Sequence, residues 1–193
     1  IDASGAMFAF VSTWVAAQFV SSLILLSLGN NAPTSETTFE LLAVGLLGAW
    51  ATYLVGMWVV SRRAGSGSMV ADYGITMRWV DLIGLGVGVI AQLVVIRLVY
   101  VPLEALWPGT FTKDRLTENA QDLLDRAGGA STLLLVAVVV IGAPVVEELF
   151  YRGLLQRSLA ARFNDGAVVV AVAAVFAAAH FRPVEFPGLF VFG

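Results

Sequence analysis

The stretch MFAFVSTWVAAQFVSSLILLSL, residues 7–28, carries no charged side chain and is about as long as the ~20 residues that a helix needs to cross a bilayer. Further predominantly apolar runs follow along the chain near residues 39–60, 82–101, 131–152 and 167–181. A soluble core has no use for several separate runs of this length. The sequence therefore predicts an all-α, polytopic transmembrane helix bundle with at least five spans.

The composition supports this class and excludes others. Hydrophobic residues make up 59% of the chain and charged residues 13%, whereas about 25% is charged in soluble domains. The net charge of −3 gives no reason to expect a nucleic-acid partner. Because the chain has no cysteine, disulfides, Cys-ligated zinc and thiol nucleophiles are excluded.

The domain organisation is predicted to be simple. Residues 1–193 are expected to form a single transmembrane domain that is a fragment truncated at its C-terminus, because the last residues fall inside an apolar stretch. Pro102 is expected to close the third run. A polar connection follows, in which Thr117–Ala127 has the pattern of a short amphipathic helix at the membrane surface or packed over the bundle.

Small residues indicate where helices approach one another. Gly48, Thr52 and Gly56 recur every four residues in the second run, and Gly84 and Gly88 share one face of the third. Such spacing is typical of close helix packing in lipid. We therefore expect two packing seams and assign no chemistry to them.

Charged residues interrupt the fourth run at Glu147, Glu148 and Arg152. One interpretation is that the helix emerges there into the lipid headgroups. The other is a polar site inside the bundle, where each charge would cost roughly 2.5–3.5 kcal/mol without partners. If a turn at Asn164 separates two antiparallel helices, a rise of ~1.5 Å per residue places Glu147 about 25 Å and His180 about 23 Å from that turn. This common depth of the only histidine and the paired glutamates favours the polar site.

The spacing also suggests different roles for the two glutamates. Glu148 and Arg152 are at i and i+4 and can form an ion pair on one helical face. Glu147 points about 100° away and is freer to act. Since adjacent carboxylates resist joint ionisation, one of them can hold a proton near neutral pH. A general base, water and hydrogen-bond donors for an oxyanion are enough to hydrolyse an amide.

Two motifs resemble a known family. Residues 144–153, PVVEELFYRG, resemble the Glu-Glu-x-x-x-Arg motif of the CPBP family, which contains the type II CAAX prenyl endopeptidases and bacterial bacteriocin-processing and Abi relatives. Residues 176–180, FAAAH, match the family's second motif, Phe-x-x-x-His, on the next apolar run. The resemblance covers residues 131–181. The family's further His and Asn residues on a later helix have no counterpart after His180.

The resemblance implies an intramembrane endopeptidase of the CAAX-protease or bacteriocin-processing type. Glu147 would be the general base that activates water, Glu148 would support it and Arg152 would order the pair. His180 would position water or stabilise the oxyanion. No cofactor is expected. A divalent metal held by Glu147 and His180 is the less favoured alternative, because adjacent glutamates on one helix do not converge easily on one ion.

The expected partners are the lipid bilayer and a membrane-associated peptide or protein substrate, with no nucleic acid. The protein is expected to be multi-pass in a bacterial plasma membrane, and its Ala- and Val-rich composition favours a GC-rich genome. Two alternatives remain open. One is a non-catalytic assembly or immunity factor of the same fold, and the other is a transporter with a proton path through the Glu and His side chains.

Overall fold

The computed structural model describes residues 2–31, 33, 36–76 and 78–193. The described residues form helices and no strand, which confirms the all-α class. They divide into two compact units: Ile1–Ile75 with Gln121–Phe163, and Thr76–Ala120 with Asn164–Gly193.

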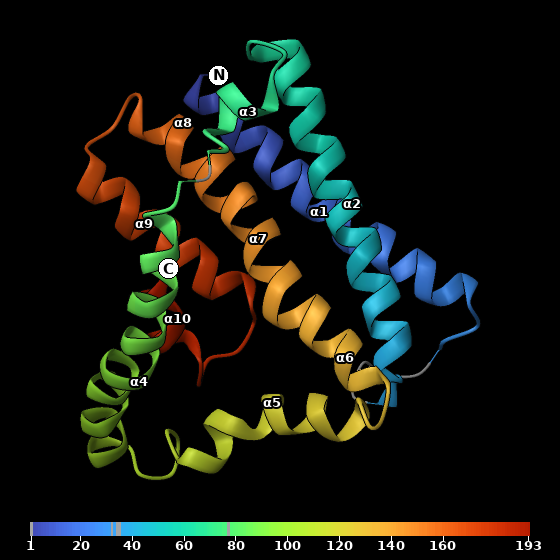
Figure 1. Cartoon of the computed structure of the whole chain (residues 1–193), viewed down its shortest axis with the longest axis vertical. Coiled ribbons are helices and arrows are strands. Elements are labelled where there is room, and N and C mark those ends of the chain that lie inside the picture. Colours follow the sequence, from blue (N-terminus) through green and yellow to red (C-terminus); the bar gives the residue numbers. More distant parts are fainter. Residues whose placement is uncertain (1, 32, 34–35, 77) are drawn as a thin grey trace. The chain divides into compact units, whose positions relative to one another are not determined.

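Four helices are long and apolar enough to cross a membrane, and they coincide with the first four predicted runs. They are α1 (Ala3–Ser27), α2 (Phe39–Ala64), the Gly86–Leu106 part of α4 (Asp81–Leu106), and the continuous helix Ser131–Ala160 (Figure 1). The fifth run forms α9 (Asp165–Ala179), which has 15 residues and is shorter than the ~20 that a perpendicular span needs. It ends just before Phe181, whose φ of 53° is left-handed and incompatible with a continuing helix.

The helix Ser131–Ala160 changes its winding along its length. It begins as α6 (Ser131–Leu135), widens to the π-helix η2 (Val136–Gly142), returns to α7 (Ala143–Glu147), widens again as η3 (Glu148–Gln156) and ends as α8 (Arg157–Ala160). Pro144 lies in the short α-helical part between the two π-helical stretches, where its missing N–H interrupts the hydrogen-bond ladder. π-Helical geometry is rare and often marks functional sites.

Two further predictions concern helix ends. The expectation that Pro102 closes the third run was wrong, because α4 continues through it to Leu106. A membrane helix tolerates proline since leaving the helix would expose backbone groups to hydrocarbon. The predicted amphipathic helix is present as α5 (Lys113–Arg126), and Gly129 follows it with a left-handed φ of 67°.

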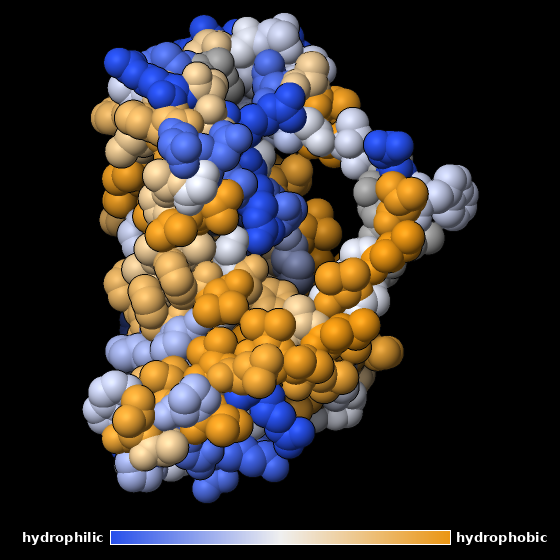
Figure 2. Space-filling model, turned by 90° about the vertical axis from the view of Figure 1, so that its left-hand side faces the viewer, coloured by the Kyte–Doolittle hydropathy of each residue, from blue (hydrophilic) through white to orange (hydrophobic). Residues whose placement is uncertain are grey.

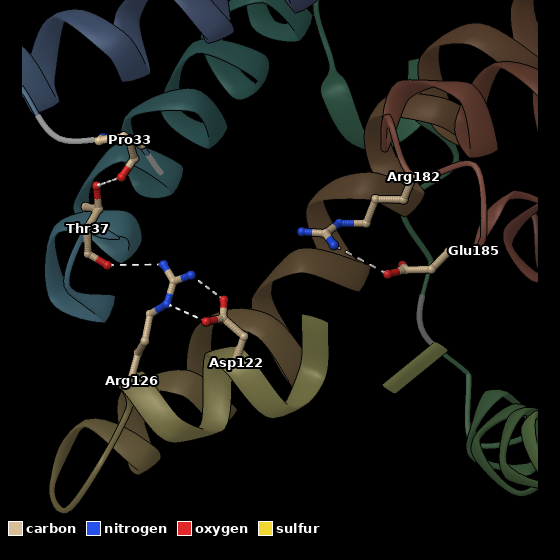
Figure 3. Close-up of polar contacts among 6 residues, drawn as sticks. All are labelled: Pro33, Thr37, Asp122, Arg126, Arg182 and Glu185. Atoms are coloured by element: carbon tan, nitrogen blue, oxygen red, sulfur yellow. Dashed lines mark hydrogen bonds and ion pairs between the residues drawn. The ribbon is translucent and has the colours of Figure 1, made fainter. Parts of the chain in front are cut away.

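Arg126, in the last turn of α5, ties that end of the helix to the loop before α2. Its guanidinium forms an ion pair with Asp122 and donates a 3.2 Å hydrogen bond to the Thr37 carbonyl (Figure 3). The Thr37 hydroxyl in turn donates to the Pro33 carbonyl at 3.1 Å. This network lies wholly within the first unit.

Helices α1 and α2 pack closely, as the first glycine spacing predicted. A Cβ on Gly56 would lie 2.5 Å from the Thr13 side chain, and one on Gly48 would collide with Ile24. The second predicted seam is not formed within its unit: a Cβ on Gly84 or Gly88 would contact no described residue.

The short helix α3 (Met69–Tyr73) is fastened to the end of α2. The Ser61 hydroxyl donates to Asp72 at 2.5 Å, and this bond holds the pKa of the Asp72 carboxyl below its usual range. Burial raises the pKa of Tyr73 to about 12, so its hydroxyl stays protonated and donates to the Met57 carbonyl at 2.6 Å.

The second unit contains α4, α9 and α10 (Phe186–Phe192), with α10 packed against the other two. The Tyr100 hydroxyl on α4 donates to the Val184 carbonyl and accepts from the Gly188 N–H, both at 3.0 Å. These bonds anchor the segment that follows α9. Apolar side chains cover much of the surface visible in Figure 2, as expected for a protein in contact with lipid.

Candidate active site

The predicted ion pair between Glu148 and Arg152 is present. The guanidinium Nη1 bonds the carboxylate Oε2 across one turn at the start of η3. The side chains of Glu148 and Arg152 are 56% and 41% exposed, so the pair lies at the surface of its unit and not in its core. Arg152 thereby neutralises one of the two adjacent carboxylates.

Glu147 is half-buried on the neighbouring face of the helix, where α2 packs against it. Two contacts bracket its position. A Cβ on Gly142 would lie 2.6 Å from the Trp50 ring, and the ring of Phe150 stacks on Tyr53 with a centroid distance of 4.2 Å. The face that carries Glu147 therefore meets α2, and the face that carries the ion pair does not.

A buried aromatic cluster holds η3 in place just after the glutamates. Phe150 is fully buried between Tyr53 and Phe10, with ring centroids at 4.2 Å and 4.5 Å. The ring of Tyr151 meets Phe10 edge-on at 5.2 Å and Phe150 at 5.7 Å. Such pairs contribute about 0.5–1.5 kcal/mol each beyond area burial. The cluster fixes this helix against both α1 and α2.

Two tyrosines surround Glu147 with polar groups that the sequence analysis did not identify. The carboxylate lies within electrostatic range of the hydroxyls of Tyr53 and Tyr151. Gln18 lies near the Tyr53 hydroxyl, and Trp14 lies near that of Tyr151. One signal was available: Gln18 is the only amide side chain in the run 7–28, and polar groups inside apolar spans tend to be functional.

His180 belongs to the second unit and caps the C-terminal end of α9. Its Nδ1 lies 2.8 Å from the Phe176 carbonyl oxygen, and its ring meets that of Phe176 edge-on at 4.7 Å. A carbonyl can only accept, so Nδ1 carries the proton. In the neutral ring, Nε2 therefore presents a lone pair.

The structure thus brings three of the four predicted site residues together within one unit. The proximity of His180 to Glu147 stays a prediction, because the two residues belong to different units. Within neither unit do the described residues bring together three His, Asp or Glu side chains that could hold a metal ion. The role of a metal also stays a prediction.

An open, mostly apolar cavity of about 380 Å³ lies between α4, the first turns of α5, α9 and α10 in the second unit. Phe176, whose carbonyl holds the His180 ring, contributes to its wall. Gln92, Thr117 and Glu185 supply polar groups, and the remainder of the lining is mainly aliphatic and aromatic.

Fold and site together define a polytopic α-helical membrane protein with a paired-glutamate site on one of its spans. Residues 129–193 match the family model Rce1-like, described as Type II CAAX prenyl endopeptidase Rce1-like. This match includes all four predicted site residues and confirms the resemblance inferred from the two motifs. The matched family is a protease family. No curated protein and no solved structure matches the chain.

Proposed function

We propose that this protein is an intramembrane endopeptidase of the CAAX-protease type, which hydrolyses a peptide bond with water activated by Glu147. The observation that carries the proposal is the Glu148–Arg152 ion pair beside a half-buried Glu147, within the segment that matches a protease family. The substrate is a peptide segment of a membrane-associated protein.

In the proposed reaction, Glu147 accepts a proton from water while the water oxygen attacks the carbonyl carbon of the substrate. The carbonyl π electrons move to the oxygen and form an oxyanion. When this intermediate collapses, the C–N bond breaks and the proton held by Glu147 passes to the leaving amine. Arg152 supports this cycle by neutralising Glu148, because an uncompensated neighbouring carboxylate would oppose the negative charge on Glu147.

His180 is proposed to position the attacking water. With Nδ1–H committed to the Phe176 carbonyl, the neutral imidazole offers Nε2 only as an acceptor. An acceptor can hold one water hydrogen while Glu147 takes the other. Donation to the oxyanion would need a ring protonated on both nitrogens, so water positioning is the role that this hydrogen bond favours.

The first prediction tests Glu147. Glu147→Gln should lower the cleavage of apolar peptides by about 100-fold or more, since general bases contribute roughly 10²–10⁴-fold. The purified protein would be reconstituted into liposomes with a library of apolar peptides, and the products identified by mass spectrometry. Glu118→Gln is a matched control, because Glu118 is exposed on the amphipathic helix α5. It should cleave like the natural protein.

Other results would change the proposal. Full activity of the Gln variant would remove Glu147 from the mechanism. Activity lost to a chelator and restored by a divalent metal would move the site to the metal alternative. If the natural protein cleaves no peptide in the library, a non-catalytic or transport function becomes the better interpretation.

A further inference from the structure

Two spans of the first unit run in the same direction. The Ser131 hydroxyl at the start of α6 donates a hydrogen bond to Glu40 in the first turn of α2. At the other end α3 links these two spans, because it packs against both α2 and η3. From Glu40 to Arg63 the rise along α2 is about 35 Å, which exceeds the ~30 Å of a hydrocarbon core. The two ends of this unit therefore lie at opposite headgroup levels.

These two ends carry opposite charge. Four exposed arginines, which we call the basic end, lie at or just after the C-terminal ends of the two spans: Arg62, Arg63, Arg157 and Arg162. The opposite end carries four carboxylates, those of Glu36, Glu40, Asp122 and Asp125. Arg126, bonded to the Thr37 carbonyl, is the only arginine or lysine there among the described residues of the unit. The first unit is therefore polarised along the direction of its spans.

Two carboxylates also lie at the basic end, and each accepts hydrogen bonds from its neighbours. Asp72 accepts from the Ser61 hydroxyl at 2.5 Å and from the Ser66 N–H at 2.8 Å. Asp2 caps α1 and accepts from the Ser4 hydroxyl at 2.5 Å. Four guanidinium groups against two carboxylates leave this end with a net positive charge.

Two of the arginines have contacts that place the basic end at the membrane interface. The Arg62 guanidinium lies over the Trp58 ring, 5.7 Å from its centroid, and Trp58 is 50% exposed. Tryptophan is enriched at the headgroup level of membrane proteins. The Arg157 guanidinium packs so closely against Gly74 that a Cβ there would collide with it. This contact holds Arg157 beside the segment that follows α2, so arginines far apart in the sequence share one surface.

We propose that the basic end binds the phosphate groups of anionic lipids in the cytoplasmic leaflet of the membrane. Charge complementarity carries the proposal, because this leaflet is negatively charged and attracts basic residues next to membrane spans. Short cytoplasmic loops also carry an excess of Lys and Arg. Arginine suits this ligand, since its planar guanidinium can form two parallel hydrogen bonds with phosphate oxygens. The inference goes beyond the proposed function and fixes the topology of the first unit.

The lipid preference would be measured by fluorescence quenching in vesicles of phosphatidylcholine that contain brominated phosphatidylglycerol or brominated phosphatidylcholine. Trp58→Phe identifies the part of the signal that comes from Trp58. In the natural protein, Trp58 should be quenched preferentially by phosphatidylglycerol. Arg63→Gln combined with Arg162→Gln should lower this preference about fivefold or more, because each basic residue near an anionic surface contributes about that factor. This variant keeps the contacts of Arg62 and Arg157.

The matched control is Lys113→Gln with Arg115→Gln, which also removes two exposed cations, here from the start of α5. It should leave the Trp58 preference unchanged. An excess of glycerol phosphate in the buffer should not displace the brominated lipid. Equal quenching by the two lipids, or an equal loss in the control, would overturn the inference. Full competition by glycerol phosphate would also overturn it, in favour of a water-soluble phosphate ligand.

The topology has its own test. Because the chain has no natural cysteine, Ala64→Cys at the end of α2 and Asn31→Cys beyond its opposite end can each be labelled with a membrane-impermeant maleimide. Both positions are exposed. In intact bacterial cells that produce the protein, we expect labelling at position 31, and at position 64 only after the membrane is permeabilised. Labelling at position 64 in intact cells would overturn the inference. Neither measurement depends on cleavage, so the lipid-binding surface and the protease can fail separately.

Discussion

The two adjacent glutamates have different neighbours, and this difference is the basis for the different roles proposed for them. Glu148 faces outward and is paired with Arg152, whereas Glu147 turns toward α2 and two tyrosines. The 100° rotation between consecutive helix residues predicted this separation. Tyr53, on α2, comes within electrostatic range of Glu147 because α2 packs against this helix, so the sequence alone could not identify this neighbour.

At the residue scale, the ion pair can be tested by removing one partner and then both. Arg152→Ala leaves the Glu148 carboxylate without its cation beside a membrane span. We expect it to lower the free energy of unfolding in detergent by about 1–3 kcal/mol. Adding Glu148→Gln should restore most of that loss, because a neutral amide needs no counter-charge. Thermal unfolding of the single and double variants would measure both effects.

If Arg152→Ala is as stable as the natural protein, Arg152 does not compensate Glu148 energetically. Loss of cleavage in such a variant would then place Arg152 in substrate handling. If the double variant is less stable than Arg152→Ala alone, the ion pair is not the source of the loss.

At the scale of elements, the helix Ser131–Ala160 shows what a hydropathy pattern leaves out. Its apolar run predicted a membrane helix, and the structure contains a helix there that is long and apolar enough to cross a membrane. The π-helical stretches on either side of Pro144 were not predicted, because a periodicity of 3.6 residues contains no signal for a wider turn. Glu147, the proposed general base, lies at the junction of α7 and η3, where the winding changes.

The packing of α1 against α2 leads to a prediction about two glycines. Gly56→Ala should destabilise the protein by about 1–3 kcal/mol, because its Cβ would lie 2.5 Å from the β-branched side chain of Thr13. Gly88→Ala is the control on α4, where a Cβ would contact no described residue. It should not lower the free energy of unfolding, and it could raise it by up to about 1 kcal/mol, because alanine favours a helix more than glycine does. Unfolding in mixed micelles would compare them, and equal destabilisation would refute the difference between the two helices.

For the whole molecule, the sequence predicted the class, the long spans and the Glu148–Arg152 ion pair better than the contacts between helices. Hydropathy identifies spans because the bilayer requires long apolar helices. Contacts are harder to predict, because Gly48 and Gly88 have the same spacing signal, yet among the described residues of its own unit only Gly48 meets another helix. The prediction that the third run ends at Pro102 was wrong for a related reason, because the rule that proline ends a helix is weaker in lipid.

The last prediction concerns the distance between Glu147 and His180. It rests on the similar distances of these two residues from the turn at Asn164. If α9 returns antiparallel to the helix Ser131–Ala160, the side chains of Glu147 and His180 should come within roughly 3–7 Å, or one bridging water. Because the chain has no natural cysteine, the pair Glu147→Cys and His180→Cys can be tested with a short thiol cross-linker in liposomes. We expect an efficient cross-link. The control pair is Glu147→Cys with Val169→Cys, since Val169 is exposed on α9 about 16 Å nearer the turn. It should not react, because the reagent cannot span that displacement.

Absence of the first cross-link, or equal yields for both pairs, would separate His180 from the glutamates. Proton exchange through a shared water would then be out of reach, and the protease mechanism would lose one of its residues.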